Sequence, residues 1–182
     1  MQKVDYNGLH DIGRELLVAI GEDPDRPGLI DTPRRFADSW KAFIEYDPGK
    51  TETTFESVTA DQMVVVKGMR VWSLCEHHLL PFWCDVSVGY IAKKKILGLS
   101  KFARVAHQHA HKLQVQEQLV HDIATHLQEQ LDTIDIAVFA RGEHLCMTMR
   151  GIKTPSEMIS SAMFGKFRSS HSVRSEFLSL VK

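Results

Sequence analysis

The sequence has little of what marks secreted, membrane-spanning or nucleic-acid-binding proteins. No apolar run in its 182 residues approaches the ~20 that a membrane-spanning helix needs. The N-terminus lacks the basic and then apolar pattern of a secretory signal, so we expect a cytoplasmic protein. The 22 basic and 23 acidic residues nearly cancel, whereas nucleic-acid-binding domains usually carry a basic excess or patch. We therefore expect neither a membrane nor a nucleic acid as a partner.

Cysteine is scarce as well. The three cysteines, Cys75, Cys84 and Cys146, are odd in number and widely spaced, which does not fit a disulfide framework. In a reducing compartment they are better interpreted as thiols or metal ligands. Internal repeats, low-complexity tracts and long Pro/Gly-rich linkers are also missing, and the 43% hydrophobic content is enough for one core. These features predict a single globular domain.

Apolar spacing predicts helices and strands in alternating groups. Helical spacing occurs over residues 7–20, 100–112 and 116–131, and Thr32-Pro33 is typical of the cap and first turn of another helix over 34–46. Extended patterns occur over residues 63–67, 71–74, 83–91, 134–140 and 145–150, and the tail from Glu157 is expected to be helical with loops. This order predicts an α+β fold with an antiparallel four-stranded sheet covered by helices on one face. The other face of such a sheet would be bare, which argues for an oligomer.

The most informative stretch is Cys75-Glu76-His77-His78. Its Cys-x-x-His spacing lets one tight loop present a thiolate and an imidazole to the same ion, and zinc favours both ligands. Cys146 is the best candidate for a third ligand. Three protein ligands leave a fourth position for water, which is the catalytic pattern, and bound zinc lowers the pKa of that water to ~7. A single motif of this kind can also arise by chance.

Histidines beside these ligands are candidates for proton transfer. If residues 143–150 are extended, His144, Cys146 and Arg150 point to one face of the strand. His77 and His144 are not needed as ligands, and imidazole titrates near physiological pH. We therefore expect these two histidines to carry protons.

The remaining histidines are interpreted as ordinary. His107 and His111 form an i, i+4 pair that could rival the first site, but such a pair without a carboxylate or cysteine is more often solvated. The same interpretation covers His109, His121, His126 and His171. Cys84 falls on the apolar side of its expected strand and is predicted to be packed.

Several motifs resemble the signatures of the GTP cyclohydrolase I family. They follow one another in unbroken order from about Gly21 to the end of the chain. The matching stretches are residues 31–35, 73–78, 98–104, 114–117, 143–147, 149–151, 167–168 and 174–178. Several motifs at consistent spacings make this resemblance highly specific.

The resemblance implies a fold and an assembly. The family has the tunnelling fold (T-fold), in which an antiparallel sheet and helices assemble into a toroidal homodecamer of two pentameric rings, with active sites between subunits. On this basis we expect one GTP cyclohydrolase I domain over residues 1–182. It would consist of an N-terminal helical part at 1–48 and a catalytic T-fold part at 60–182.

The resemblance also implies the metal centre. One zinc ion per subunit falls on Cys75, His78 and Cys146. His77 and His144 match the proton-transferring histidines of the family. The Cys-x-x-His spacing had indicated Cys75 and His78, and the resemblance adds the assignment of Cys146 and of the two proton-transferring histidines.

Substrate-binding residues follow from the same motifs. Gln116 and Glu117 match positions that hold the guanine edge, and a carboxylate is suited to guanine because N1–H and the 2-amino group are donors. A triphosphate needs converging cations, and arginine can grip phosphate bidentately. The positions around ribose and triphosphate match Ser100, Lys101, Arg104, Arg150 and Arg35.

Two features depart from the family pattern. Where members often carry a lysine, the second expected helix has Asp38, with Lys41 one turn on. A phosphate contact from that helix face is therefore in question. The helix after Ser100 is also rich in histidine, with His107, His109 and His111 where aromatic or arginine residues are expected.

The implied reaction is the zinc-dependent hydrolysis of GTP to 7,8-dihydroneopterin triphosphate and formate, the first step of tetrahydrofolate and pterin biosynthesis. One alternative is a related T-fold cyclohydrolase with a different metal, such as iron, or a different product. Another is a non-catalytic, zinc-containing module that binds a pterin or purine. A zinc base deaminase is excluded, because the chain lacks that class's His-x-Glu and Pro-Cys-x-x-Cys motifs.

Overall fold

The computed structural model describes residues 3–58 and 61–182. The chain divides into two compact units, Met1–Asp47 and Pro48–Lys182. No helix in the described ranges is long and apolar enough to cross a lipid bilayer.

The first unit is a pair of helices, α1 (Tyr6–Ala19) and α2 (Thr32–Ile44). They pack closely because α1 carries a glycine at the contact. A Cβ on Gly13 would lie 3.1 Å from the Phe36 ring and 3.2 Å from the Pro33 Cα. Both helices are confirmed: α1 was predicted from apolar spacing and α2 from the Thr32-Pro33 cap.

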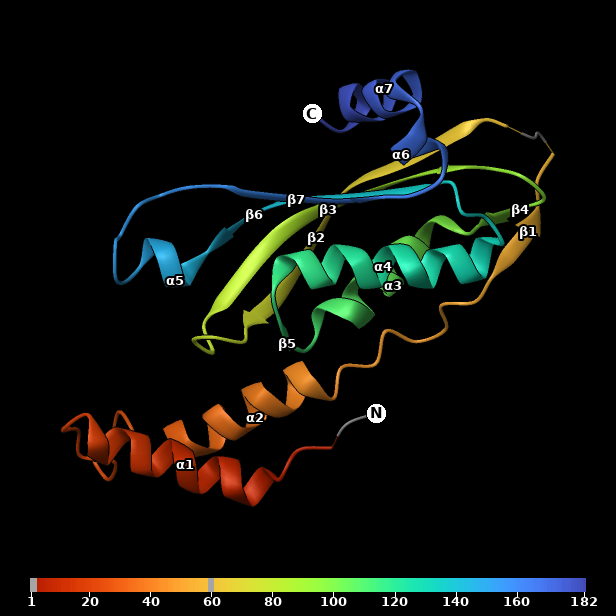
Figure 1. Cartoon of the computed structure of the whole chain (residues 1–182). Helices are drawn as coiled ribbons and strands as arrows, with labels where there is room; N and C mark the ends of the chain where they lie inside the picture. The colour runs from red at the N-terminus through yellow and green to blue at the C-terminus, as the bar shows by residue number, and fades with distance from the viewer. Residues whose placement is uncertain (1–2, 59–60) are drawn as a thin grey trace. The chain divides into compact units, whose positions relative to one another are not determined.

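A five-stranded sheet forms the centre of the second unit (Figure 1). Its strand order is β5-β2-β3-β6-β7, and every neighbouring pair is antiparallel except β2 and β5, which are parallel. The strands are β2 (Met63–Cys75), β3 (Pro81–Ile91), β5 (Leu113–Gln114), β6 (Ile136–His144) and β7 (Met158–Met163). A separate two-stranded sheet joins β1 (Thr54–Glu56) to β4 (Lys95–Leu97).

The expected four-stranded antiparallel sheet is therefore wrong in two respects. The two residues of β5 are too few to produce a periodic pattern, and their parallel pairing depends on α3 returning the chain to β2. β7 lies where the tail was predicted to be helical, and its sequence Met-Ile-Ser-Ser-Ala-Met does not alternate between apolar and polar residues. The α+β class itself is confirmed.

Two helices, α3 (Leu99–Ala110) and α4 (Gln116–Leu131), cover one face of the sheet. The inward residues of β3 and β6 meet the apolar stripe of α4 in a fully buried core. Cys84 belongs to this core, as predicted, and burial raises the pKa of its thiol to about 12. Both helices were expected from their spacing.

The opposite face of the sheet is not bare. The short helix α6 (Lys166–Ser169) and the C-terminal helix α7 (His171–Val181) lie over part of it (Figure 1). Phe177 of α7 approaches the sheet where β3 has no side chain, since a Cβ on Gly89 would lie 2.6 Å from the phenyl ring. The prediction of helices on one face only is thus corrected, because the spacing of the tail does not reveal where it docks.

The chain after β6 turns instead of continuing as a strand. Residues Leu145–Thr148 form the single-turn helix α5, in which the Met149 amide donates to the Leu145 carbonyl over 3.1 Å. The extended segment predicted at 145–150 is wrong. Its alternating apolar residues do not face a core, since Met147 and Met149 are 40% and 58% exposed.

Replacing Gly142 with alanine tests how closely β6 lies against β3. A Cβ at this position would lie 2.6 Å from the Cys84 Cβ and still closer to the Trp83 carbonyl oxygen, so it would force the two strands apart. We expect Gly142→Ala to lower the free energy of unfolding by about 1–3 kcal/mol, as overpacked cores do, measured by urea denaturation. Ser161→Ala, at an exposed position of β7, is the control and should change it by less than ~0.5 kcal/mol. Equal stability of the two variants would contradict this packing.

Candidate metal centre and substrate site

The sheet register brings several predicted site residues to one end of the sheet. Phe82, at the start of β3, pairs with Ser73 near the end of β2 and with His144 at the end of β6. Gln114 of β5 pairs with Cys75 and leads directly into α4. The ends of β2 and β6 and the first turn of α4 therefore lie together.

Cys75, His78 and Cys146 form a cluster at this end. Their ligand atoms all lie within 4.8 Å of one another, and the Cys75 Sγ is 3.7 Å from the His78 Nδ1. Ideal zinc bonds to sulfur and nitrogen at a tetrahedral angle place these two atoms about 3.6 Å apart. A tight turn sets this spacing, because the amides of His78 and Leu79 both donate to the Cys75 carbonyl. The cluster can therefore hold a metal ion.

The electrostatics of the two thiols favour a cation between them. Loss of solvent is the main effect that raises the pKa of Cys146. The charge of Cys75 and a hydrogen bond to it raise this pKa further, while Arg150 lowers it. A divalent ion would stabilise the thiolate form of Cys146, which the neighbouring Cys75 disfavours in its absence. The donor set of two thiols and one imidazole is the kind that zinc prefers.

His144 is held on two sides. Its ring is 9% exposed and stacks on Phe82, with ring centroids 4.4 Å apart and an interplanar angle of 4°. Its Nε2 lies 3.0 Å from the Oε1 of Gln116. Burial lowers the pKa of His144, and the charge of Glu117 opposes this shift. The imidazole is therefore neutral near pH 7 and can accept a proton.

Gln116 is fully buried, and its amide group is occupied by protein partners. Its Nε2 donates to the Ala140 and Met158 carbonyls, each over 3.2 Å, and to the Ser160 hydroxyl over 3.0 Å. Because this nitrogen faces three acceptors, the Oε1 must be the atom that faces His144. With a side chain 0% exposed, Gln116 does not offer its amide to a ligand in this conformation.

Glu117 and His77 lie on the solvent side of the same end. Glu117, in the first turn of α4, lines a cleft of about 540 Å³ together with residues of β7 and Arg168. The His77 Nδ1 is 3.9 Å from the Cys75 Sγ, and its Nε2 is 3.8 Å from a carboxylate oxygen of Glu76. Arg168 was not among the predicted site residues, although it lies in one of the motif stretches.

Three of the residues predicted to bind ribose and triphosphate lie at the start of α3, away from the Cys75, His78 and Cys146 cluster. Ser100, Lys101 and Arg104 are in the first turns of α3, where Lys101 donates to the Lys50 carbonyl over 2.7 Å and Arg104 donates to the Pro48 carbonyl. The far end of α3 is the one that leads to Cys75, and 12 residues of helix span about 18 Å. The structure does not bring these three residues to the cluster within one chain.

Arg35 belongs to the first unit. Its guanidinium is exposed and lies 3.4 Å from the carboxylate of Asp31. Asp38 of the same helix, which stands where a lysine was expected, accepts hydrogen bonds from Tyr6 over 2.8 Å and from Arg34 over 3.0 Å. Asp38 is therefore occupied within its own unit.

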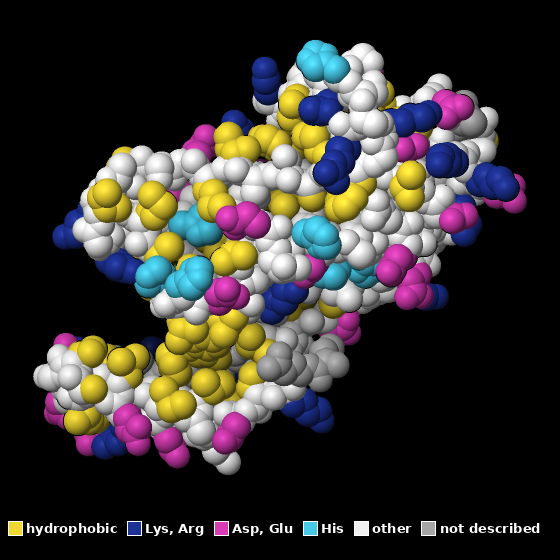
Figure 2. Space-filling model, in the orientation of Figure 1, with side chains coloured by type: hydrophobic (Ala, Val, Ile, Leu, Met, Phe, Trp, Pro, Cys, Tyr) yellow, Lys and Arg dark blue, Asp and Glu magenta, His cyan; other side chains and the backbone are white. Residues whose placement is uncertain are grey.

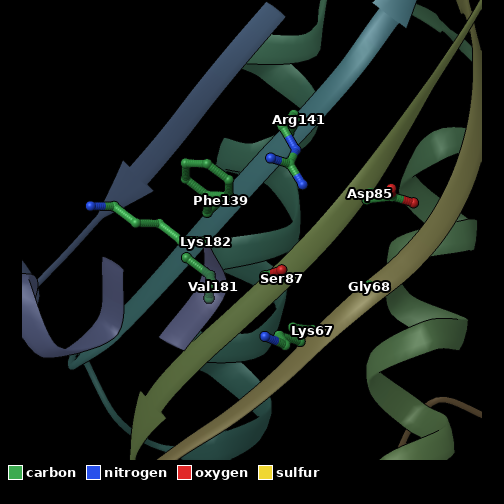
Figure 3. A pocket seen from close by; sticks show the side chains of 8 residues that line it. All are labelled: Lys67, Gly68, Asp85, Ser87, Phe139, Arg141, Val181 and Lys182. Carbon is green, nitrogen blue, oxygen red and sulfur yellow. The ribbon is translucent and has the colours of Figure 1, made fainter. Parts of the chain in front are cut away.

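A second hollow, of about 260 Å³, lies on the opposite face of the sheet (Figure 3). Lys67, Asp85 and Arg141 line it beside the end of α7. Asp85 is already paired with Arg70 over 2.8 Å, and no predicted site residue lines this hollow. It is therefore not the candidate site.

Comparison with known proteins identifies the kind of protein to which these residues belong. The profile of the GTP cyclohydrolase I family matches residues 10–182. The GTP cyclohydrolase 1 of Sulfurihydrogenibium sp. is 43% identical over 180 residues, which cover 98% of this chain and 96% of that protein. The enzyme of the same name from Deinococcus radiodurans is 45% identical over 181 residues, covering 97% and 84%. That of Saccharomyces cerevisiae is 42% identical over 177 residues, covering 92% and 71%.

Gln116→Met tests whether the buried amide positions His144. Methionine has a similar shape, but its thioether is only a weak acceptor for the imidazole N–H and cannot donate to the carbonyls. We expect turnover to fall about 10- to 100-fold with unchanged metal content, and the free energy of unfolding to fall by about 1–3 kcal/mol, because buried acceptors lose their donor. Turnover and metal analysis are measured side by side.

The matched control is Gln108→Met, at an exposed position of α3. It should retain both turnover and stability. Wild-type turnover in Gln116→Met would remove the amide from any role in orienting His144.

Proposed function

This chain belongs to the GTP cyclohydrolase I family and is a hydrolase of that type, and we propose that its reaction takes place around Cys75, His144 and Glu117. The substrate is GTP, and the products are 7,8-dihydroneopterin triphosphate and formate. The observation that carries the assignment is the convergence of a Cys-His-Cys set, a buried imidazole and a carboxylate at one end of the sheet.

The metal is proposed to be one zinc ion per subunit, held by Cys75, His78 and Cys146. When bound, such an ion supplies Lewis-acid activation of a water molecule. The two thiols and the imidazole fit zinc in type and in spacing. Buried Cys75 anchors the set on the sheet, while exposed His78 leaves one side open to substrate.

His144 is proposed to move a proton at its Nδ1. Its Nε2 faces the Oε1 of Gln116, which can only accept, so the Nε2 carries the hydrogen. The Nδ1 is then the basic atom that accepts a proton and returns it to a ring nitrogen of the substrate. Stacking on Phe82 and the bond to Gln116 hold the ring in one orientation. Gln116 is thus a positioning residue rather than the guanine contact that its motif implied.

Glu117 is proposed to hold the guanine edge. Its side chain lines the cleft, and its carboxylate can accept from both N1–H and the 2-amino group of guanine. His77 lies on the open side, where it can exchange protons with solvent.

The overall reaction consumes one water molecule. Water adds to C8, the imidazole ring of guanine opens and a second water releases formate. The rearranged ribose then closes onto the freed amine with loss of one water, so one water is consumed overall.

The site is proposed to be completed by a neighbouring subunit in a toroidal decamer. Arg150, whose charge reaches Cys146, can meet the substrate from the same chain. Ser100, Lys101 and Arg104 begin α3, where free amides and the helix dipole favour phosphate, but they lie at the end of that helix away from Cys75. A second subunit must therefore supply these three residues. Arg35 is proposed to reach the triphosphate within the same oligomer.

Incubation of the metal-quantified protein with GTP tests the reaction. We expect both formate and the mass of dihydroneopterin triphosphate. Cys146→Ser should lose metal and turnover together, whereas His144→Ala should keep its metal and lose turnover by at least ~100-fold, the scale of a general acid–base group. Formate without the pterin would indicate a related cyclohydrolase with another product. Neither product from a zinc-loaded oligomer would indicate a binding module.

Mixing two inactive variants tests the shared site. Arg104→Ala and His144→Ala damage opposite halves, so subunits refolded together should form some intact sites. Random mixing at equal amounts predicts recovery to about a quarter of wild-type turnover if each site takes its halves from two chains.

The control is wild type mixed with the double variant, which should show that inactive chains enter the oligomer. No recovery in properly mixed oligomers would place both halves of the site in one chain.

A further inference from the structure

A groove between α3 and α4 gathers imidazoles and carboxylates away from the Cys75, His78 and Cys146 cluster. This α3–α4 groove has a volume of about 340 Å³ and is lined by His109, His121, Asp122, His126 and Glu129 among others. Figure 2 shows histidine and acidic side chains side by side on the face that carries α4. None of these residues has a task in the proposed reaction.

Two of the histidines, His109 and His126, are hydrogen-bonded directly to each other. The His109 Nε2 lies 2.8 Å from the His126 Nδ1, and the two rings are nearly perpendicular at 86°. The His126 Nε2 is a further 2.8 Å from the Nε2 of Gln130, whose buried Oε1 has no hydrogen-bond partner. One shared proton therefore joins two imidazoles that come from different helices.

Both imidazoles are neutral near pH 7. Burial lowers the pKa of His109 to about 4, with His126 and Lys112 adding to the shift and Asp122 opposing it. Burial also lowers the pKa of His126, which Glu129 and Glu52 oppose. A neutral imidazole is the form that binds a metal ion.

The charges around the pair are mostly negative. Asp122 and Glu129 line the groove, and the charge of Asp122 acts on His109 while those of Glu129 and Glu52 act on His126. Lys112 is the cation that acts on His109, and its Nζ is already bound to an Asp122 oxygen over 2.6 Å. Two neutral imidazoles among three carboxylates and one engaged lysine are suited to a divalent cation.

The nitrogen spacing fits the same occupant. Two imidazole nitrogens bound side by side to one ion, each at ~2.0–2.1 Å and at a right angle, lie about 2.9 Å apart. The observed separation is 2.8 Å. Ring rotation is needed to turn both lone pairs toward one point, and the open groove gives the ion access.

We propose that the α3–α4 groove binds a divalent transition-metal ion through His109 and His126, with water completing the ligand set and with Asp122 and Glu129 supplying negative charge in the same groove. When the ion binds, the shared proton moves to the Nε2 of His126, and the Gln130 amide turns its Oε1 toward that nitrogen, so both imidazoles stay neutral. Imidazole with carboxylate selects nickel, copper or zinc over magnesium or calcium. The sequence pattern pointed instead to His107 and His111, whose ring centroids are 6.0 Å apart on one helix.

Nickel titration of the full-length protein, already loaded with one equivalent of zinc, tests the proposal. We expect one further equivalent per chain by calorimetry. His126→Gln and His109→Gln should each weaken nickel binding at least 10-fold, because glutamine keeps a hydrogen-bonding group but is a poor ligand for these ions. Cys146→Ser should retain the nickel site, which separates it from the proposed catalytic metal.

His171→Gln, at an exposed position at the start of α7, is the matched control and should bind nickel as wild type does. Copper added to the zinc-loaded wild type gives a second test that needs no variant, since electron paramagnetic resonance detects coupling to imidazole nitrogen. Absence of a second equivalent, unchanged nickel affinity in His126→Gln, or a copper spectrum without nitrogen coupling would each overturn the proposal. In that case the pair is a structural hydrogen bond only.

Discussion

A single buried amide joins the elements on which the candidate site is built. Gln116 begins α4, and its side chain reaches the Ala140 carbonyl of β6 and the Met158 carbonyl and Ser160 hydroxyl of β7. Buried carbonyls and hydroxyls without donors are costly, so the start of α4 has one favourable position against these strands. The oxygen of the same amide meets His144. The contact that fixes the helix on the sheet thus also fixes the orientation and tautomer of the imidazole.

The metal cluster combines rigid and adaptable supports in a similar way. Cys75 ends the long strand β2 and is 5% exposed, so its sulfur is fixed by the sheet. His78 follows through a tight turn, and Cys146 sits in a single-turn helix just past β6. Ligands on short turns can adjust to an ion, whereas the buried strand residue defines where the ion lies. Such a division agrees with a catalytic centre that must keep one side open.

The sequence predicted which residues form the cluster better than it predicted the local structure that brings them together. The Cys75-x-x-His78 spacing is local, because three residues span one turn, and it predicted two members of the Cys-His-Cys cluster without any knowledge of the fold. Cys146 was reached through an assumed strand that does not exist, since Leu145–Thr148 is helical. The stacking of His144 on Phe82 and the burial of Gln116 left no signal in the sequence. Both depend on the register of β3 against β6, which periodicity does not fix.

The histidine-rich helix shows the same limit from the other side. Spacing along one helix favours His107 with His111, because residues four apart lie on one face. Spacing cannot reveal a partner on another helix, and the short contact joins His109 of α3 to His126 of α4. That pairing arises because β5 returns the chain beside β2, and α4 then runs along α3. When several similar side chains are available, the tertiary fold determines which of them meet. The spacing of residues along one helix does not.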